Sequence, residues 1–271
     1  MGTFVIAGGN GGIGLEVGRE LLGAGHRVIL LGRENQKGEA ALASLGAARE
    51  RAEFLSVDLS THDGVRDAAR RIDERTDRID GLLHSAAVFE TRNVRTKDDL
   101  PLFVGLSYVG RYHLTQLLMP KLLLADNPRV MMFVATLNET PKIDLAPFPR
   151  FRDFNFLKSV VSLNGACLYY ANYLTTTYPK LFAGCATPGF VRTGIFRNAP
   201  WYIKAYVAVV GPFTAISAQK AAHNVVQALR RAKGPAFNWN KPGDFESGFE
   251  IQADPAVQKV LIDQLHELTG V

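Results

Sequence analysis

Short apolar runs alternate with longer segments of helical period along most of the chain. Six of the runs have the length and the β-branched content of strands, and they cover residues 3–7, 27–31, 53–57, 81–85, 130–135 and 181–186. Several, such as FVIA and VMMFVA, are apolar without interruption, which is typical of parallel strands covered on both faces. The pattern therefore predicts an α/β fold, a doubly wound parallel sheet with helices on both faces. No repeat or linker divides the chain, so we expect residues 1–271 to form a single domain.

The overall composition is that of an ordinary globular protein. With 47% hydrophobic and 21% charged residues, it excludes a disordered or fibrous chain. The net charge of +5 raises the question of a nucleic-acid partner. In the most basic stretch, however, arginines alternate with acids while Val65, Ala68 and Ile72 keep a helical apolar stripe. This is the pattern of a solvated helix face, and we expect no nucleic-acid partner.

The cysteines and the apolar stretches indicate where in the cell the protein is expected to be. Cys167 and Cys185 lie in apolar surroundings without a histidine at metal-ligand spacing. They predict buried thiols in a reducing compartment and no metal site. The chain opens in a strand-like run rather than an export signal. Its longest apolar stretch, residues 201–216, is interrupted before it reaches the ~20 residues that span a bilayer. We therefore expect a cytoplasmic protein with no membrane partner.

The strongest functional motif is AGGNGGIG at residues 7–14, where the first predicted strand ends and a helix begins near Gly12. Gly8, Gly12 and Gly14 permit a tight turn, and Asn10 and Ile13 belong to the same turn. Its backbone N–H groups and the helix N-terminus can approach a pyrophosphate. In this strand-turn-helix setting the motif favours dinucleotide binding over an ordinary turn.

The G-x-x-x-G-x-G spacing resembles that of the short-chain dehydrogenase/reductase family. The similarity continues along the chain in the family's order, to about residue 195. Asp58 and Leu59 fall where the family contacts adenine; Ser85, Ala86 and Ala87 fall in its Asn-Asn-Ala-Gly turn; and Pro188, Gly189, Val191 and Thr193 match its Pro-Gly segment on the nicotinamide side. The resemblance implies a single-domain Rossmann fold that moves hydride between a nicotinamide and a carbonyl or alcohol.

The end of the second predicted strand, Leu31-Gly32-Arg33, indicates which nicotinamide cofactor is used. An NAD enzyme places a carboxylate here on the ribose 2′-hydroxyl, whereas an NADP enzyme accommodates the 2′-phosphate with arginine. In the family's register Gly32 occupies the position of the acid and Arg33 that of the phosphate-binding residue. Glu34 lies at the generic distance for a ribose-binding acid, but beyond the family's position. The sequence therefore favours NADP(H) over NAD(H).

The resemblance breaks down at the catalytic residues. The family uses a Tyr as general acid, a Lys four residues later, and a Ser that fixes the carbonyl oxygen. None of the eight tyrosines has a Lys at i+4, so the pair that one helical turn would bring together is absent. Thr136 falls at the position of the Ser and retains a hydroxyl. Ser107 falls where the family has an Asn that supports a proton-relay water.

Two registers are possible for the helix that should carry the missing pair. Counted back from Tyr178-Pro179, the Tyr and Lys positions fall at Lys158 and Ser162. Aligned on Ala171-Asn172, they fall at Gly165 and Tyr169. Tyr169 is either a substitute acid or a core residue, and Lys158 either a substitute acid or an exposed amine at a helix start. Neither register restores the pair.

Residues 190–213 are rich in large apolar side chains, and in the family this stretch forms a lid over the substrate. Here it indicates either a pocket for a small hydrophobic substrate or a packed helix pair. The resemblance also implies a homodimer or homotetramer formed through the fourth and fifth helices. Our first hypothesis is an NADP(H)-dependent oxidoreductase acting on a hydrophobic carbonyl or alcohol. A non-redox enzyme, such as a cyclase, isomerase or dehydratase, and a non-catalytic NADP(H)-binding protein are the alternatives.

Overall fold

Eight strands form one sheet in the computed structural model, which describes residues 1–151, 155–191, 199–241 and 247–271. They are β1 (Thr3–Ala7), β2 (Arg27–Gly32), β3 (Ala52–Ser56), β4 (Gly81–His84), β5 (Arg129–Phe133), β6 (Phe182–Ala186), β7 (Phe237–Trp239) and β8 (Gly248–Glu250). Their order across the sheet is β3-β2-β1-β4-β5-β6-β7-β8. All six predicted strands are confirmed, with ends within two residues of the expected positions.

The edge formed by β7 and β8 differs from the prediction. Each of these strands has three residues, which is too short to show a period of two. β7 pairs in parallel with β6, but β8 pairs antiparallel with β7, so the sheet is not parallel throughout. The first seven strands do run in parallel, and their carboxyl ends therefore share one edge of the sheet.

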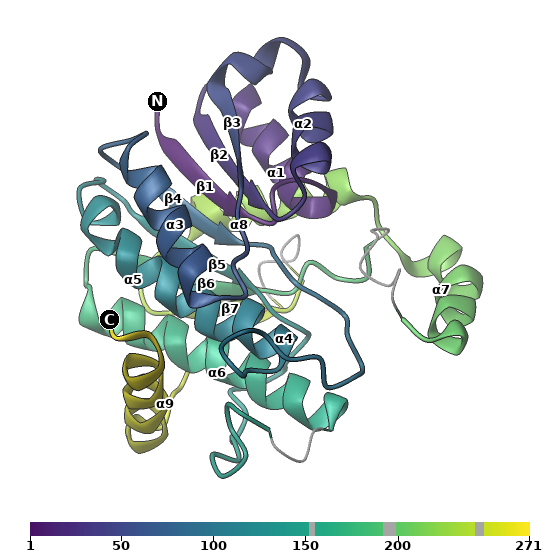
Figure 1. Cartoon of the computed structure of the whole chain (residues 1–271), viewed down its shortest axis with the longest axis vertical. Coiled ribbons are helices and arrows are strands. Elements are labelled where there is room, and N and C mark those ends of the chain that lie inside the picture. The colour runs from purple at the N-terminus through teal and green to yellow at the C-terminus, as the bar shows by residue number, and fades with distance from the viewer. Residues whose placement is uncertain (152–154, 192–198, 242–246) are drawn as a thin grey trace.

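Helices cover both faces of the sheet, as the sequence predicts (Figure 1). One hydrophobic core lies under α1, α2 and α8, and a second lies under α3, α5, α6 and α9. The helices of the described residues are α1 (Gly12–Gly23), α2 (Asn35–Ala43), α3 (His62–Asp73), α4 (Leu102–Val104), α5 (Gly110–Leu122), α6 (Phe156–Thr177), α7 (Trp201–Thr214), α8 (Ala218–Arg231) and α9 (Pro255–Thr269), with the 3₁₀ helix η1 (Gly46–Arg51) and the π-helical turn η2 (Gly105–Val109).

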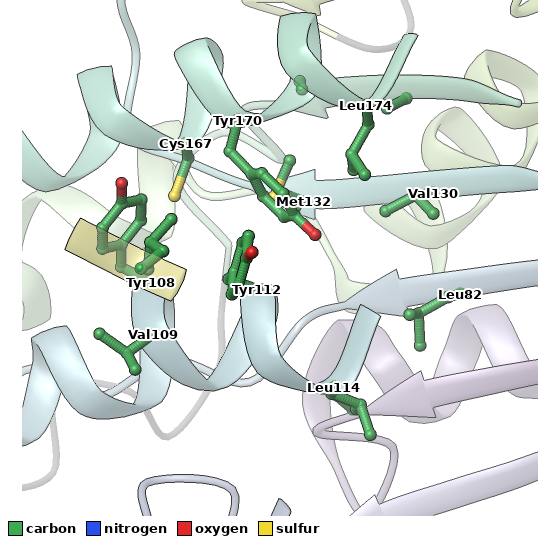
Figure 2. Packing of buried hydrophobic residues seen from close by; sticks show 14 of the residues in the cluster. Leu82, Tyr108, Val109, Tyr112, Leu114, Val130, Met132, Cys167, Tyr170 and Leu174 are labelled. Atoms are coloured by element: carbon green, nitrogen blue, oxygen red, sulfur yellow. The ribbon is translucent and has the colours of Figure 1, made fainter. Parts of the chain in front are cut away.

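Tyrosines fill the core between α5, α6 and the sheet (Figure 2). Tyr108, Tyr112 and Tyr170 are each at most 1% exposed, and the rings of Tyr112 and Tyr170 are 5.1 Å apart. Cys167 belongs to the same core, as does Cys185 on β6. Both thiols are buried and form no disulfide, which confirms their predicted core role.

Helix α9 covers part of α5 and α6. The hydroxyl of Tyr112 donates to the carbonyl of Val271 at 2.8 Å, and the amide of Asn172 donates to the side chain of Gln258 at 2.8 Å. The helix begins after Asp254, whose carboxylate accepts from two backbone amides, and it ends at Gly270, which has a φ of 74°. The surface that the resemblance assigns to dimer formation is thus occupied in part by the chain's own helix.

Helix α7 stands apart from the body of the molecule (Figure 1). It lies in an excursion that leaves the carboxyl end of β6 and returns at α8. The amide of Ile216 donates to the carbonyl of Phe190 at 3.0 Å, and Val191 and Ile216 form a β-bridge, so the two ends of the excursion are joined. The predicted lid corresponds to this excursion, although Phe196 and the side chains of Tyr206 and Phe213 lie outside the described residues. No helix in the described part of the chain is long and apolar enough to cross a membrane.

His113 on α5 and His62 on α3 form a histidine pair beneath the surface. Their Nδ1 atoms are 3.3 Å apart, and Nε2 of His113 has no hydrogen-bond partner among the described residues. Burial, together with the nearby His62 and Arg66, lowers the pKa of His113 from 6.5 to about 4. His113 is therefore uncharged in the folded protein at neutral pH.

Acid is expected to destabilise the fold through His113. Because its pKa is lower in the folded than in the unfolded chain, its stabilising effect is complete above about pH 6.5 and declines as the pH falls toward 4. Between about pH 7 and about pH 5 this residue should cost about 2 kcal/mol of unfolding free energy. In urea unfolding at both pH values, His113→Gln should lose less stability than the wild type. Equal losses in the two proteins would contradict the assignment.

Candidate active site

The turn between β1 and α1 makes backbone contacts too close for any side chain. Gly8 has a φ of 81°, and a Cβ there would lie 2.6 Å from the backbone nitrogen of Ala86. A Cβ at Gly14 would lie 2.3 Å from the carbonyl oxygen of Gly8. Both α1 and the turn after β4 therefore pack directly against this turn.

The first turn of α1 leaves its backbone amides open to a ligand. Gly11 is the N-cap, no side chain caps the helix, and its first turn carries no acidic residue. Asn10 and Ile13 are half-buried beside the opening, and Gly12 is exposed with a φ of 53°. Unsatisfied N–H groups and the positive end of the helix dipole suit a pyrophosphate. The predicted glycine turn thus fits a dinucleotide.

At the end of β2, the position of the ribose-binding acid is filled from the glycine turn. A Cβ at Gly32 would lie 2.6 Å from the amide group of Asn10. The next residue, Arg33, is exposed, and its guanidinium pairs with no carboxylate of the described residues. The carboxylate of Glu34 instead binds Lys37 at 2.5 Å. An acid at position 32 would require the side chain of Asn10 to move, whereas the arginine at 33 is open to an anion.

The end of β3 is fixed by a local hydrogen-bonded turn. The carboxylate of Asp58 accepts from the amide and the hydroxyl of Ser60, at 3.0 and 2.6 Å. Leu59 is buried, and its carbonyl oxygen would lie 2.2 Å from a Cβ at Gly110 on α5. These contacts place Asp58 and Leu59 at the same sheet edge as the glycine turn.

The turn after β4 lies against the glycine turn. The amide of Ser85 donates to the carbonyl of Ala7 at 2.9 Å, and its hydroxyl would lie 3.1 Å from a Cβ at Gly14. Ala86 is half-buried and Ala87 is exposed. The structure therefore brings the three residues predicted in this turn beside the phosphate-binding glycines.

His84, the residue before this turn, is a buried neutral histidine. Its Nε2 lies 2.9 Å from the hydroxyl of Thr115, which donates its own proton to the carbonyl of Arg111 at 2.7 Å. The Thr115 oxygen must therefore accept, and Nε2 of His84 carries the proton. Burial, and secondarily the charge of Arg111, lower the pKa of His84 well below its usual value. His84 thus has a structural role here.

Sequence reasoning missed Arg111, a buried cation beneath the site. Arg111 is 3% exposed. Its guanidinium donates to the carbonyls of Phe133 at 2.7 Å and Ala86 at 3.3 Å. One of its nitrogens also lies 3.6 Å from the thiol of Cys167, and its Nε has no partner in the described structure. Arg111 thereby joins the end of β5 to the turn after β4. A lone charged residue within the apolar stretch LSYVGRYHL was the available clue.

Two of the four predicted catalytic residues, Thr136 and Ser107, lie after β5 and within η2. Thr136 is exposed, three residues beyond the end of β5. Ser107 is buried within the π-helical turn η2, and its carbonyl accepts from the thiol of Cys167 at 3.4 Å. Single π-turns inside helices frequently mark functional positions. Thr136 thus presents an exposed hydroxyl, while Ser107 lies in the core.

Lys158 and Tyr169 lie in different surroundings along α6. Lys158 is exposed in the first turn of α6, where its amide is capped by the side chain of Asn155 at 3.1 Å. Tyr169 is 4% exposed, its hydroxyl meets the backbone of Asp254 at the start of α9, and burial raises its pKa. These placements match an exposed helix-start amine and a core tyrosine.

The segment after β6 continues along the same sheet edge. Pro188 is half-buried, Gly189 is exposed with a φ of 84°, and Val191 is buried in the bridge to Ile216. Thr193 lies outside the described residues. Pro188, Gly189 and Val191 thus lie where the α7 excursion begins.

Comparison with known families decides the family of the chain. The profile of the family described as short chain dehydrogenase matches residues 3–140, just over half of the chain. The chain belongs to this family. The Rossmann-like fold and the oxidoreductase relationship predicted from the glycine turn are thereby confirmed.

Relatives extend the similarity beyond the matched segment. The short-chain dehydrogenase/reductase prx1 of Penicillium rubens is 26% identical over 202 residues, which cover 72% of this chain and 59% of that protein. The polyprenol dehydrogenase of Mus musculus is 24% identical over 234 residues, 83% of this chain and 70% of that protein. The chain thus aligns with less than two thirds of the length of prx1.

A solved structure shows the same fold. An alcohol dehydrogenase from the archaeon Thermococcus sibiricus, complexed with 5-hydroxy-NADP, superposes with a TM-score of 0.68 at 15% identity. The match covers 88% of this chain and 95% of that one. Similarity at this level of identity establishes the arrangement of strands and helices.

Proposed function

We propose that this protein is an NADP(H)-dependent oxidoreductase acting on a hydrophobic carbonyl or alcohol through an atypical active site. The observation that carries the proposal is the end of β2, where Asn10 fills the space at Gly32 and Arg33 stands open. Together with the amides of α1, this arrangement fits a nucleotide that carries a 2′-phosphate. When bound, the nicotinamide supplies or accepts hydride.

Replacing Arg33 with alanine should erase most of the preference for NADPH over NADH. A charge-assisted contact to phosphate contributes about 1.5–3 kcal/mol, or roughly 10- to 150-fold in affinity. Calorimetry should show weaker NADPH binding and unchanged NADH binding. Arg49→Ala, which removes an exposed arginine bound to Glu39 at 3.6 Å, is the matched control and should change neither affinity. Equal affinity of the wild type for both cofactors would contradict the role of Arg33.

The chain's own residues support slow hydride transfer without the Tyr/Lys pair. The hydroxyl of Thr136 would bind the substrate oxygen, and water at this exposed position would exchange the proton. Arg111 holds the carbonyls of Ala86 and Phe133, so it fixes the two turns between which the substrate would lie. Orientation of bound reactants contributes more to the rate than a general acid, whose loss costs about 10²- to 10⁴-fold.

The hydrophobic substrate is supported by two features. The excursion carrying α7 is rich in apolar residues and starts at the nicotinamide side of the site. A relative that aligns over 83% of this chain is named polyprenol dehydrogenase, after a long apolar alcohol. An apolar wall beside a few polar groups is the usual construction of such a pocket.

A labelled cofactor tests the reaction. The enzyme is incubated with a panel of hydrophobic ketones and NADPH that carries deuterium at C4 of the nicotinamide. Deuterium in the alcohol product would establish hydride transfer. Unlabelled product formed without NADPH oxidation would replace this function with the non-redox alternative, which the missing Tyr/Lys pair favours.

A further inference from the structure

The exposed face of α7 is a continuous apolar surface formed by Trp201, Tyr202, Ala205, Ala208 and Val209. At 100° per residue these positions fall within one arc of the helix. Trp201 is 79%, Val209 70% and Tyr202 56% exposed, which places three of the most exposed large apolar side chains of the described residues on this helix. A cluster of exposed apolar side chains of this kind on a soluble protein usually marks a site that contacts a partner or a membrane.

The stretch of sequence that contains α7 is basic. Between Asp153 and Asp244 the sequence contains no acidic residue but ten lysines and arginines. Lys204 is exposed at the edge of the apolar arc, and Lys220 is exposed in the first turn of α8, directly after the excursion. Lysines in such positions attract anionic headgroups, each by an amount that corresponds to about a fivefold gain in binding.

The dimensions of the face do not suit a second protein. A helix of 14 residues is about 20 Å long, so one of its faces offers roughly 200–300 Å². A stable interface needs about 800 Å² from each partner. The helix is also too short to span the ~30 Å of a hydrocarbon core. Trp and Tyr at one end, small aliphatic residues between, and a lysine at the edge are the composition of a helix that lies in a membrane interface.

We propose that the exposed face of α7 docks on an anionic lipid bilayer, with Trp201 and Tyr202 inserted at the headgroup level and Lys204 in contact with phosphate. Because Val191 and Ile216 join the ends of the excursion at the carboxyl edge of the sheet, docking would tether the edge that carries the candidate site to the membrane. Peripheral docking departs from the sequence-based expectation of no membrane partner. It does not depend on the proposed reaction.

The two tryptophans of the chain allow a direct test. Trp239 is buried at 6% exposure, so the Trp239→Phe variant leaves Trp201 as the sole indole reporter. Vesicles of phosphatidylcholine with phosphatidylglycerol should shift its emission to shorter wavelength, and lipids with brominated acyl chains should quench it. Phosphatidylcholine alone should give a weaker response. In flotation of the otherwise unmodified chain, Trp201→Ser with Tyr202→Ser should reduce vesicle binding by about tenfold or more.

Matched variants distinguish docking through the α7 face from nonspecific binding to the vesicles. Lys204→Gln should lower binding to the anionic vesicles about fivefold. Leu124→Ser, which removes another exposed apolar side chain (64%) at the end of α5, should leave binding unchanged. Flotation of the Trp201/Tyr202 variant at the wild-type level would overturn the proposal. Lipid-free self-association that disappears in that variant would also overturn it, because a second copy would then cover the face.

Discussion

Gly14→Ala is expected to weaken NADPH binding by more than about 100-fold, an effect of about 3 kcal/mol. The new Cβ would lie 2.3 Å from the carbonyl oxygen of Gly8 and 3.1 Å from the hydroxyl of Ser85. To relieve that overlap α1 must move away from the turn after β1. The N–H groups of its first turn would then no longer point toward the phosphates.

Gly23→Ala is the matched control at the other end of the same helix. Gly23 is exposed, and a Cβ there meets nothing within 4 Å. Calorimetry should therefore show nearly unchanged NADPH affinity for Gly23→Ala and an affinity at least about 100-fold lower for Gly14→Ala. Comparable affinities in the two variants would show that the cofactor does not use this turn.

Thr136→Val is expected to lower turnover by about 10²- to 10³-fold while leaving NADPH affinity almost unchanged. The hydroxyl would bind the carbonyl oxygen as negative charge develops on it, and loss of one such donor has an effect of this size. Thr136→Ser keeps the hydroxyl and should retain most of the activity. The measurement is the single-turnover rate of deuterium transfer from labelled NADPH. A wild-type rate in Thr136→Val would remove Thr136 from the site.

The parts of the fold that depend on local physics could be predicted from the sequence. Uninterrupted apolar runs predicted six strands, because a strand buried on both faces needs no polar position. The glycine turn was predictable because the steric demand at Gly8 and Gly14 leaves one residue type. The three-residue strands β7 and β8 carry no comparable pattern, and the antiparallel edge was missed with them.

The parts that depend on tertiary contacts could not be predicted. Whether Tyr169 faced the substrate or the core depended on α9, which lies more than 80 residues away in sequence. Arg111 gains its role only when β4 and β5 bring two carbonyls to its guanidinium. A family comparison could place neither, because the pair that normally defines this part of the site is missing from the chain.

Helix α9 also has a consequence for the order of events during synthesis. Tyr112 makes its hydrogen bond to Val271, a partner 159 residues later in the chain. By contrast, β1 pairs with β2, which follows it closely in the sequence. At about 5–20 residues per second a ribosome takes roughly ten seconds or more to deliver Val271. Until α9 has emerged, the tyrosine-lined surface of α5 lacks part of its cover. Nascent chains should therefore need protection by a chaperone until then.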